Sequence, residues 1–202
     1  NSHALITGGT KGIGRATAIE FLNLGARVCI VSRTEEDIAE FTKEHENLIG
    51  IKADMSMLSE YGKVIDFVEA HFGKLDILVN NVGVNIRKKT IEYTPDEYDQ
   101  IINTNLTSTF EMSKLVYPYL KESDSGKIVN VSSVAGEKHL RTGSIYGMTK
   151  AAVIQLTKNL AAEWAPDNIR VNTVSPWYIR TPLAETVLKD KAYYNEVISR
   201  TP

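Results

Sequence analysis

The sequence contains one cysteine, Cys29, among 202 residues, so no disulfide can form within the chain. This suits a reducing compartment, and we expect a cytoplasmic location. Basic residues are not in excess, because 23 Lys and Arg residues are balanced by 25 Asp and Glu residues, for a net charge of −2. Proteins that follow a nucleic-acid backbone need a basic surface, so no nucleic-acid partner is expected. No apolar stretch approaches the ~20 residues of a membrane helix, so no membrane partner is expected either.

Metal-ligand spacings are missing as well. The four histidines lie far apart in the sequence, at His3, His45, His71 and His139. Metal sites commonly draw closely spaced ligands from one element, so we predict no metal site.

The composition is that of a folded chain, with 43% hydrophobic and 24% charged residues. Its length fits one α/β domain better than two, so residues 1–202 are expected to form a single domain. The chain begins at Asn1 without a methionine and enters a strand almost at once, so we interpret it as trimmed. An organellar targeting peptide therefore stays open as an alternative.

Short apolar runs rich in β-branched residues alternate with longer amphipathic segments. The runs are apolar on both faces, as in a parallel sheet covered by helices, and predict strands at Ala4–Ile6, Arg27–Val31, Leu48–Ala53, Leu75–Asn80, Lys127–Val131 and Ile169–Val174. The first helix is expected to end at Gly25 and to carry on one face Ile13, Thr17, Phe21 and Leu24. Further helices are predicted at Glu35–Glu46 after the N-cap Thr34, Tyr61–Phe72, Pro95–Glu122 with a break near Asn103–Thr107, and Ser144–Trp164. This alternation implies right-handed crossovers and a doubly wound, Rossmann-type parallel sheet in three αβα layers.

A glycine-rich turn, Thr7–Gly14, joins the first strand to the first helix. Glycines let the backbone turn sharply and approach a pyrophosphate, whose charge the helix N-terminus stabilises. The spacing is G-x-x-x-G-x-G, with Thr10 where the common G-x-G-x-x-G fingerprint has its second glycine. A P-loop does not fit, because it needs Gly-Lys-Ser/Thr and Gly14 is followed by Arg15. The turn predicts dinucleotide binding, with a turn that binds no ligand as the alternative.

Tyr146 and Lys150 lie four residues apart on one face of a predicted helix. Tyr117–Lys121 has the same spacing, but it lies at a helix end where we expect solvent. Ser133 precedes Tyr146 by thirteen residues, just past the strand predicted at 127–131. Catalytic groups of open α/β sheets gather beyond the carboxyl ends of strands, which favours a catalytic Tyr146. A structural tyrosine beside a solvated lysine is the alternative.

Together these motifs resemble the short-chain dehydrogenase/reductase family over nearly the whole chain and in the family's order. The family's T-G-x-x-x-G-x-G turn matches Thr7–Gly14, and its N-N-A-G motif matches Asn80–Gly83. Its catalytic asparagine, serine, tyrosine and lysine match Asn105, Ser133, Tyr146 and Lys150. Within the family, the segments Asn80–Arg87 and Ala162–Leu183 are most similar to tropinone-reductase-like members.

The chain departs from the family pattern at three places. Val82 replaces the usual alanine of N-N-A-G, which is a mild packing change. The family's Pro-Gly after the sixth strand reads Pro176-Trp177, so the shape of the pocket does not follow from the resemblance. Ile179 and Thr181 keep the family pattern that holds the nicotinamide amide. Family members continue through a seventh, C-terminal strand, which is missing from this chain because it ends at Pro202.

The resemblance implies an enzyme that moves a hydride between a nicotinamide cofactor and a carbonyl or alcohol carbon. Tyr146 is then expected to deliver the proton, and Ser133 to hold the substrate oxygen. Lys150 is expected to bind the nicotinamide ribose, and Asn105 to hold a water in a proton relay. A cation ~4 Å from a phenol, at an effective dielectric near ~20, is worth up to ~4 kcal/mol, or about three pKa units. We therefore expect Lys150 to lower the pKa of Tyr146 from ~10 to near ~7.

NADP(H) is expected rather than NAD(H). NAD-specific dinucleotide folds place a carboxylate after the second strand, where it binds the ribose hydroxyls and repels a phosphate. Here that strand ends in Ser32-Arg33, and a second cation, Lys11, lies in the glycine turn, although both could be solvated surface charges. Asp54 matches a family position beside the adenine, with a helix N-cap as its alternative. The predicted cofactor-binding residues are Gly8, Thr10, Lys11, Gly12, Ile13, Gly14, Ser32, Arg33, Asp54, Met55, Asn81, Gly83, Tyr146, Lys150, Pro176, Ile179 and Thr181.

Arg87, Trp177 and Tyr178 are predicted to border the substrate pocket. Tropinone is largely a cationic amine at neutral pH, so Arg87 would repel it, unless Glu137 offsets that charge. Trp177 and Tyr178 offer apolar surface. A neutral or anionic, hydrophobic ketone, or the corresponding alcohol, is therefore the expected small-molecule substrate.

Two other functions fit the sequence less well. A non-catalytic NADP-binding sensor on the same fold needs the glycine turn, but it has no use for Ser133, Tyr146 and Lys150 together. A serine hydrolase needs a G-x-S-x-G nucleophile elbow, and Ser132-Ser133 lacks both glycines.

The resemblance also implies a homodimer or homotetramer, because family members commonly pair through two long helices. These are expected here at about Asn105–Glu122 and Ser144–Trp164. Both helices carry more apolar positions than one buried face requires, although core packing could use each of them, at Leu115, Val116, Leu156 and Leu160.

Overall fold

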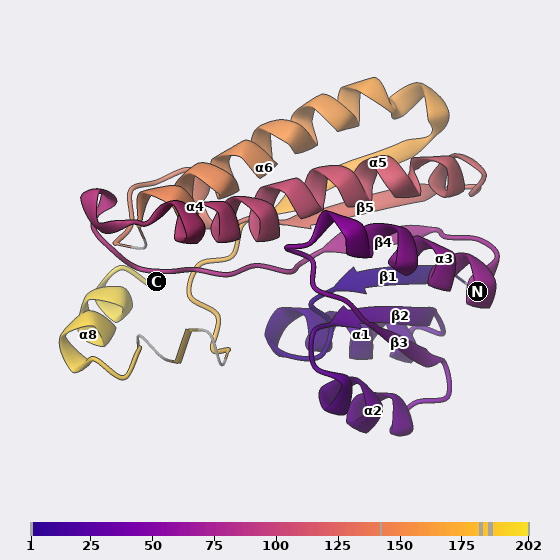
Figure 1. Ribbon diagram of the computed structural model, residues 1–202, viewed down its shortest axis with the longest axis horizontal. Helices are drawn as coiled ribbons and strands as arrows, with labels where there is room; N and C mark the ends of the chain where they lie inside the picture. The colour runs from indigo at the N-terminus through magenta and orange to yellow at the C-terminus, as the bar shows by residue number, and fades with distance from the viewer. Residues whose placement is uncertain (1, 142, 182–183, 186–187, 202) are drawn as a thin grey trace.

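Six parallel strands form one sheet in the order β3-β2-β1-β4-β5-β6. The computed structural model describes residues 2–141, 143–181, 184–185 and 188–201. The strands are β1 (His3–Thr7), β2 (Arg27–Ser32), β3 (Leu48–Lys52), β4 (Ile77–Asn80), β5 (Gly126–Val131) and β6 (Ile169–Val174). The strand order reverses at β1 and β4, which lie side by side in the middle of the sheet (Figure 1). The doubly wound parallel sheet is therefore confirmed.

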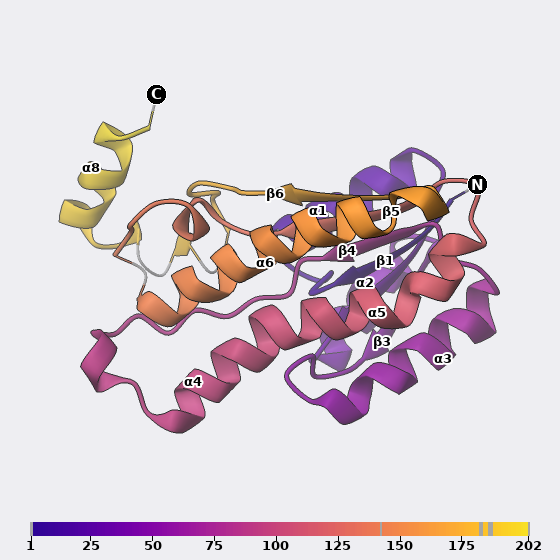
Figure 2. The same ribbon diagram turned by 90° about the horizontal axis from the view of Figure 1, so that it is seen from above.

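Helices cover both faces of this sheet (Figures 1 and 2). The helices of the described residues are α1 (Gly12–Asn23), α2 (Glu35–Lys43), α3 (Tyr61–Phe72), α4 (Pro95–Ile102), α5 (Ser108–Lys121), α6 (Ser144–Glu163) and α8 (Lys191–Ser199). Helices α1 and α2 pack on one face, and α3, α5 and α6 pack on the other. These are the three predicted layers. Within the described residues, no helix is long and apolar enough to cross a membrane.

The inner strands are buried because both of their faces meet a helical layer, whereas the edge strand β6, expected to be apolar on both faces, exposes every second residue. Leu5 and Ile6 are neighbours on β1, and their side chains point to opposite faces. Leu5 packs into the cluster that includes α3, α5 and α6, whereas Ile6 packs into the cluster that includes α1. Every residue of β1 is buried, which is why its sequence shows no polar alternation.

The predicted buried face of α1 is wrong at its last position. The side chain of Leu24 is 74% exposed, because α1 ends at Asn23 and Leu24 lies beyond the last turn. The buried positions of α1 are Gly14 and Ala18. Gly25 follows with φ +81°, which confirms it as the stop signal.

The predicted break in the long helix is confirmed. A single turn of π-helix, Asn103–Thr107, separates α4 from α5. Such wide turns inside helices occur frequently at functional sites. The buried side chain of Asn105 leaves the helix here and bonds to the backbone of Val84, with its Oδ1 accepting from N (2.8 Å) and its Nδ2 donating to O (2.9 Å).

Candidate active site

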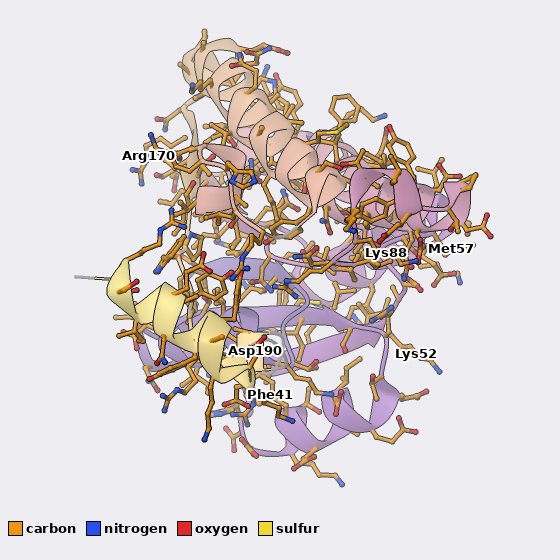
Figure 3. The ribbon with its side chains drawn as sticks, turned by 90° about the vertical axis from the view of Figure 1, so that its left-hand side faces the viewer. Phe41, Lys52, Met57, Lys88, Arg170 and Asp190 are labelled. Carbon is orange, nitrogen blue, oxygen red and sulfur yellow. The ribbon has the colours of Figure 1, made fainter. Side chains whose placement is uncertain are left out.

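One cavity of about 760 Å³ opens beyond the carboxyl ends of the strands. Figure 3 views this end of the molecule, with α8 in front of the sheet and Asp190 at the start of that helix. Segments that follow all six strands line the cavity, so residues far apart in the sequence meet there. This is the place where open α/β sheets bind ligands.

The glycine turn forms one wall of the cavity. Gly8 and Gly12 have φ angles of +68° and +54°, a backbone region that side chains with a Cβ rarely adopt. Gly14 does not line the cavity; it lies behind the turn, where a Cβ would be 2.3 Å from the backbone oxygen of Gly8. Glycine at this position lets the first turn of α1 pack directly under the loop.

Asn81 ties the segment after β4 to this turn. Its Nδ2 donates to the carbonyl oxygens of Thr7 (2.9 Å) and Gly8 (3.0 Å). The Thr7 hydroxyl in turn accepts from the backbone N–H groups of Asn81 and Val82. These bonds fix the relative positions of two loops that both line the cavity.

Ser133, Tyr146 and Lys150 line the cavity together. Tyr146 and Lys150 face it from the first turns of α6, and Lys150 is only 4% exposed. The Lys150 ammonium donates to the carbonyl oxygen of Val131 (2.9 Å) and lies 5.7 Å from the centre of the Tyr146 ring. Burial lowers the pKa of Lys150 to about 8.

The pKa expected for Tyr146 is wrong in this cofactor-free arrangement. Burial raises the pKa of Tyr146 above its ordinary value, and this outweighs the lowering by the Ser133 hydroxyl and the Arg87 charge. The main cause is this burial, and the Lys150 ammonium is bonded to the Val131 carbonyl oxygen. Lys150 is not among the groups that lower the pKa of Tyr146.

Two glycines let the surrounding loops reach α6. At Gly143, with φ +93°, a Cβ would be 2.0 Å from the Tyr93 hydroxyl oxygen, which itself donates to the Ile86 carbonyl (2.6 Å). At Gly136 a Cβ would be 2.7 Å from the backbone carbon of Lys150. Close packing here holds the Ser133 loop and the start of α6 against each other.

Asn105 lies behind the cavity wall and does not line it. A Cβ at Gly83 would be 3.6 Å both from Asn105 Oδ1 and from Lys150 Nζ, so the three residues are neighbours. Asn105 also donates to the Thr149 hydroxyl (3.3 Å). It braces the loop after β4 and the helix that carries Lys150.

The far end of the cavity contains the residues expected near the adenosine. Ser32 and Arg33 line it at the end of β2, and the Thr10 and Ser32 hydroxyls are 3.0 Å apart. The Lys11 ammonium forms an ion pair with Asp37 (2.6 Å), a lining residue of α2 that the sequence reasoning missed.

Asp54 has a local structural role as well as a place in the cavity wall. Its Oδ1 accepts from the backbone N–H (2.9 Å) and the hydroxyl (2.8 Å) of Ser56. Asp54 therefore caps a turn rather than a helix N-terminus, and it lines the cavity beside Met55.

The opposite end of the cavity is bordered by Arg87, Trp177 and Tyr178, as predicted. The Tyr178 hydroxyl also bonds to that of Tyr193, which attaches helix α8 to this segment. Asn85 also lines the cavity, and no motif of the sequence indicated it.

Most predicted site residues meet in this one cavity. Those that line it are Gly8, Thr10, Lys11, Gly12, Ile13, Ser32, Arg33, Asp54, Met55, Asn81, Gly83, Arg87, Ser133, Tyr146, Lys150, Pro176, Trp177, Tyr178, Ile179 and Thr181. Pro182 and Leu183, which end the segment 162–183 that carries the resemblance, lie outside the described residues.

The second Tyr-x-x-x-Lys pattern is separate from the cavity. Tyr117 lies in α5, half-buried rather than at a solvated helix end, and its hydroxyl donates to Asp167 (2.7 Å). Lys121 forms an ion pair with the same carboxylate (2.8 Å). Both residues are engaged in a surface cluster.

Comparisons with known proteins identify the family of this chain. A family model described as short chain dehydrogenase matches residues 2–192. A tropinone reductase homolog of Arabidopsis thaliana is 49% identical over 204 residues, covering 98% of this chain and 77% of that protein. A second Arabidopsis thaliana homolog, described as chloroplastic, is 45% identical and is covered over 63% of its length, against 98% of this chain. The structure of a 3-ketoacyl-(acyl-carrier-protein) reductase from Brucella melitensis, complexed with NADH, has a TM-score of 0.88 and 33% identity, covering 92% of this chain and 79% of that one. The chain therefore belongs to the short-chain dehydrogenase/reductase family.

Proposed function

We propose that this chain is an NADP(H)-dependent oxidoreductase that reduces a carbonyl to an alcohol, or catalyses the reverse. Its family membership makes it an oxidoreductase that uses a nicotinamide cofactor. The catalytic set in this proposal is Ser133, Tyr146, Lys150 and Asn105. The observation that carries it is that Ser133, Tyr146 and Lys150 line the same cavity as the glycine turn.

The residues of the cavity fit a dinucleotide. Gly8 and Gly12 bring the backbone and the N-terminus of α1 to the cavity, where a pyrophosphate is stabilised. The volume lies within the range of about 300–1,000 Å³ that is usual for ligand sites. In this arrangement Asp54 and Met55 border the adenosine, whereas Ile179 and Thr181 bind the nicotinamide amide. When bound, the cofactor supplies or accepts the hydride.

The chain's own residues then manage the charge on the substrate oxygen. Negative charge develops on a carbonyl oxygen during reduction, and the Ser133 hydroxyl donates a hydrogen bond to it. The raised pKa of Tyr146 keeps its phenol protonated at neutral pH, as a proton donor requires. Lys150 stays mostly charged below its pKa of about 8 and donates to the nicotinamide ribose. Asn105 braces Lys150's helix and holds a water in the proton relay.

Replacement of the proton donor tests the reaction. Tyr146→Phe should lower turnover by at least a hundredfold and leave NADPH binding nearly intact, because only the proton donor is lost. The matched control is Tyr117→Phe, which changes the other Tyr-x-x-x-Lys pattern outside the cavity. Turnover is followed by nicotinamide absorbance with a ketone panel. Retention of a tenth or more of the turnover by Tyr146→Phe would contradict the assignment, and an NADPH-binding protein without turnover would be a sensor.

Cofactor preference depends on Arg33 in this proposal. Arg33 is exposed at the end of β2, and within the described residues no carboxylate lies within 4 Å of it. A charge-assisted hydrogen bond is worth roughly 1.5–3 kcal/mol, so Arg33→Ala should weaken NADPH binding about ten- to a hundredfold and barely change NADH binding. Lys52→Ala, an exposed cation at the end of β3, is the control. Equal losses for both cofactors, or a wild-type preference for NADH, would overturn the assignment.

We further infer a neutral or anionic hydrophobic ketone as substrate, because Arg87 borders the pocket. Glu137 does not line that cavity. Tropinone as the best substrate of the ketone panel would refute this inference.

The chain is further proposed to act as a single domain in the cytoplasm, with an organellar location as the alternative that a chloroplastic relative raises.

Pairing into a dimer or tetramer through α5 and α6 is also proposed. Of the apolar positions named for it, Val116 and Leu160 are buried in the chain's own core, so they supply no surface. Phe110 and Met148, which are 47% and 53% exposed on these helices, support the pairing instead. Light scattering that shows a monomer at micromolar concentration would contradict it.

A further inference from the structure

Arg87 lacks a partner although much of its side chain is buried. Its Nε is fully buried and has no hydrogen-bond partner, and in the described part of the chain no carboxylate lies within 4 Å of its guanidinium. Its neighbour Lys88, which Figure 3 shows beside α4, forms an ion pair with Glu97 (2.5 Å). Arg141 forms one with Glu196 of α8. Lys88 and Arg141 therefore have carboxylate partners in the protein, whereas Arg87 faces the cavity with its charge unpaired.

A second orphaned atom lies in the same wall. Oδ1 of Asn85 is buried and has no hydrogen-bond partner, and Asn85 and Arg87 both line the cavity. Folded proteins seldom leave buried polar groups unpaired, because each pays its full desolvation cost. Two such groups, two residues apart beside a ligand cavity, indicate partners that arrive with the substrate.

The surroundings of Arg87 indicate an anion. The side chains that close this end of the cavity are aromatic or aliphatic, from Trp177, Tyr178 and Leu140. The Arg87 charge lowers the pKa values of both Tyr146 and Tyr178, so it lies close to the proton donor. A planar guanidinium with a free Nε–H matches the two oxygens of a carboxylate.

We propose that Arg87 binds a carboxylate of the substrate, so that the enzyme reduces an oxo acid or oxidises the hydroxy acid; the orphaned Asn85 Oδ1 is an acceptor, so it binds a donor and not that carboxylate. This inference rests on the proposed carbonyl chemistry. Because Arg87 lies near Tyr146, the carboxylate is separated from the reacting carbonyl by a few bonds. The apolar remainder of the substrate packs against Trp177 and Leu140.

The test compares an aliphatic 2- or 3-oxo acid with its methyl ester, which has the same carbonyl and no negative charge. The wild type should favour the acid about ten- to a hundredfold in kcat/KM. Arg87→Met keeps the apolar stem and should remove that preference through a higher KM for the acid, with the ester nearly unchanged. Lys89→Met, an exposed cation two residues further on, should keep the preference.

The outcomes separate this inference from the proposed function. Turnover of acid and ester with similar kcat/KM in the wild type, or equal losses for both in Arg87→Met, leaves the reaction standing and overturns the carboxylate site. If no carbonyl compound is turned over, the proposed reaction fails, and the carboxylate site is then tested by binding of the oxo acid. The oxo acid with NADPH should then still raise the Tm of the wild type but not of Arg87→Met. A rise in both proteins, or in neither, would overturn the carboxylate site.

Discussion

Lys150→Met should make the protein more stable and inactive at the same time. Lys150 is buried as a cation, and its side chain has one hydrogen bond, to the Val131 carbonyl. Methionine has a similar length and no charge, so it can fill the same space without desolvation of an ion. The folded state is therefore less stable with the Lys150 ammonium in its cavity than with an uncharged side chain of similar length.

The size of this loss of stability follows from the pKa of Lys150. Lysine in an unfolded chain has a pKa near 10.5, and burial lowers that of Lys150 to about 8. At ~1.4 kcal/mol per pKa unit, keeping the charge at pH 7 costs the folded state about 3 kcal/mol. Loss of the donor to Val131 in the variant subtracts about 1 kcal/mol. The net gain is about 2 kcal/mol, which corresponds to a Tm higher by roughly 4–8 °C.

The assay is urea unfolding of the cofactor-free wild type, Lys150→Met and Lys158→Met, at several pH values. Lys158 is an exposed lysine of the same helix and serves as the control. Between pH 8 and 10.5 the folded wild type binds fewer protons than the unfolded chain, so its stability rises with pH there. The gap between wild type and Lys150→Met should therefore close by roughly 2 kcal/mol from pH 7.5 to 10.

The reasoning would be refuted if Lys150→Met were less stable than the wild type at pH 7. It would also be refuted if the gap between them did not change with pH, because a buried charge requires that change. Loss of turnover in Lys150→Met, without a loss of fold, completes the expected result.

Two shorter predictions concern the cofactor end. Gly14→Ala should abolish NADPH binding in a fluorescence titration, because its Cβ would be 2.3 Å from the Gly8 oxygen; Gly62→Ala, where a Cβ meets nothing within 4 Å, should bind normally. Asp37→Asn should raise the ratio of kcat/KM for NADPH over NADH roughly two- to fivefold, since it frees Lys11 from an exposed ion pair. An unchanged or lower ratio would place Lys11 away from the phosphate.

The sheet could be predicted from the sequence because both faces of its inner strands are buried. The run 28–31 is apolar at every position, and that signal needs no knowledge of the rest of the fold, whereas 169–174 alternates because one face of β6 is exposed. The predicted and observed strand ends differ by at most two residues, with β4 starting at Ile77 instead of Leu75. The break at Asn103–Thr107 was predictable too, and its π-helical turn is what places Asn105 behind the site.

The partners of the charged side chains could not be predicted. Lys11 and Asp37 are 26 residues apart, and their ion pair depends on how the glycine turn packs against α2. The pKa predicted for Tyr146 was wrong for the same kind of reason, because burial by residues of other elements raises it. Local spacing shows which residues share a helix face, but not which groups from other elements reach them.

The charges of the cavity are distributed unevenly, and this favours reduction at one end. Of its described lining residues, the acidic ones are Asp37 and Asp54, which both lie at the adenosine end. Lys150 and Arg87 lie at the other end, where no carboxylate lines the wall in the described part of the chain. In the proposed reaction, these two cations stabilise the negative charge that develops on a carbonyl oxygen, before any rearrangement is needed. The same positive charge opposes a cationic amine, so in this proposal the same residues select the charge of the substrate and promote its reduction.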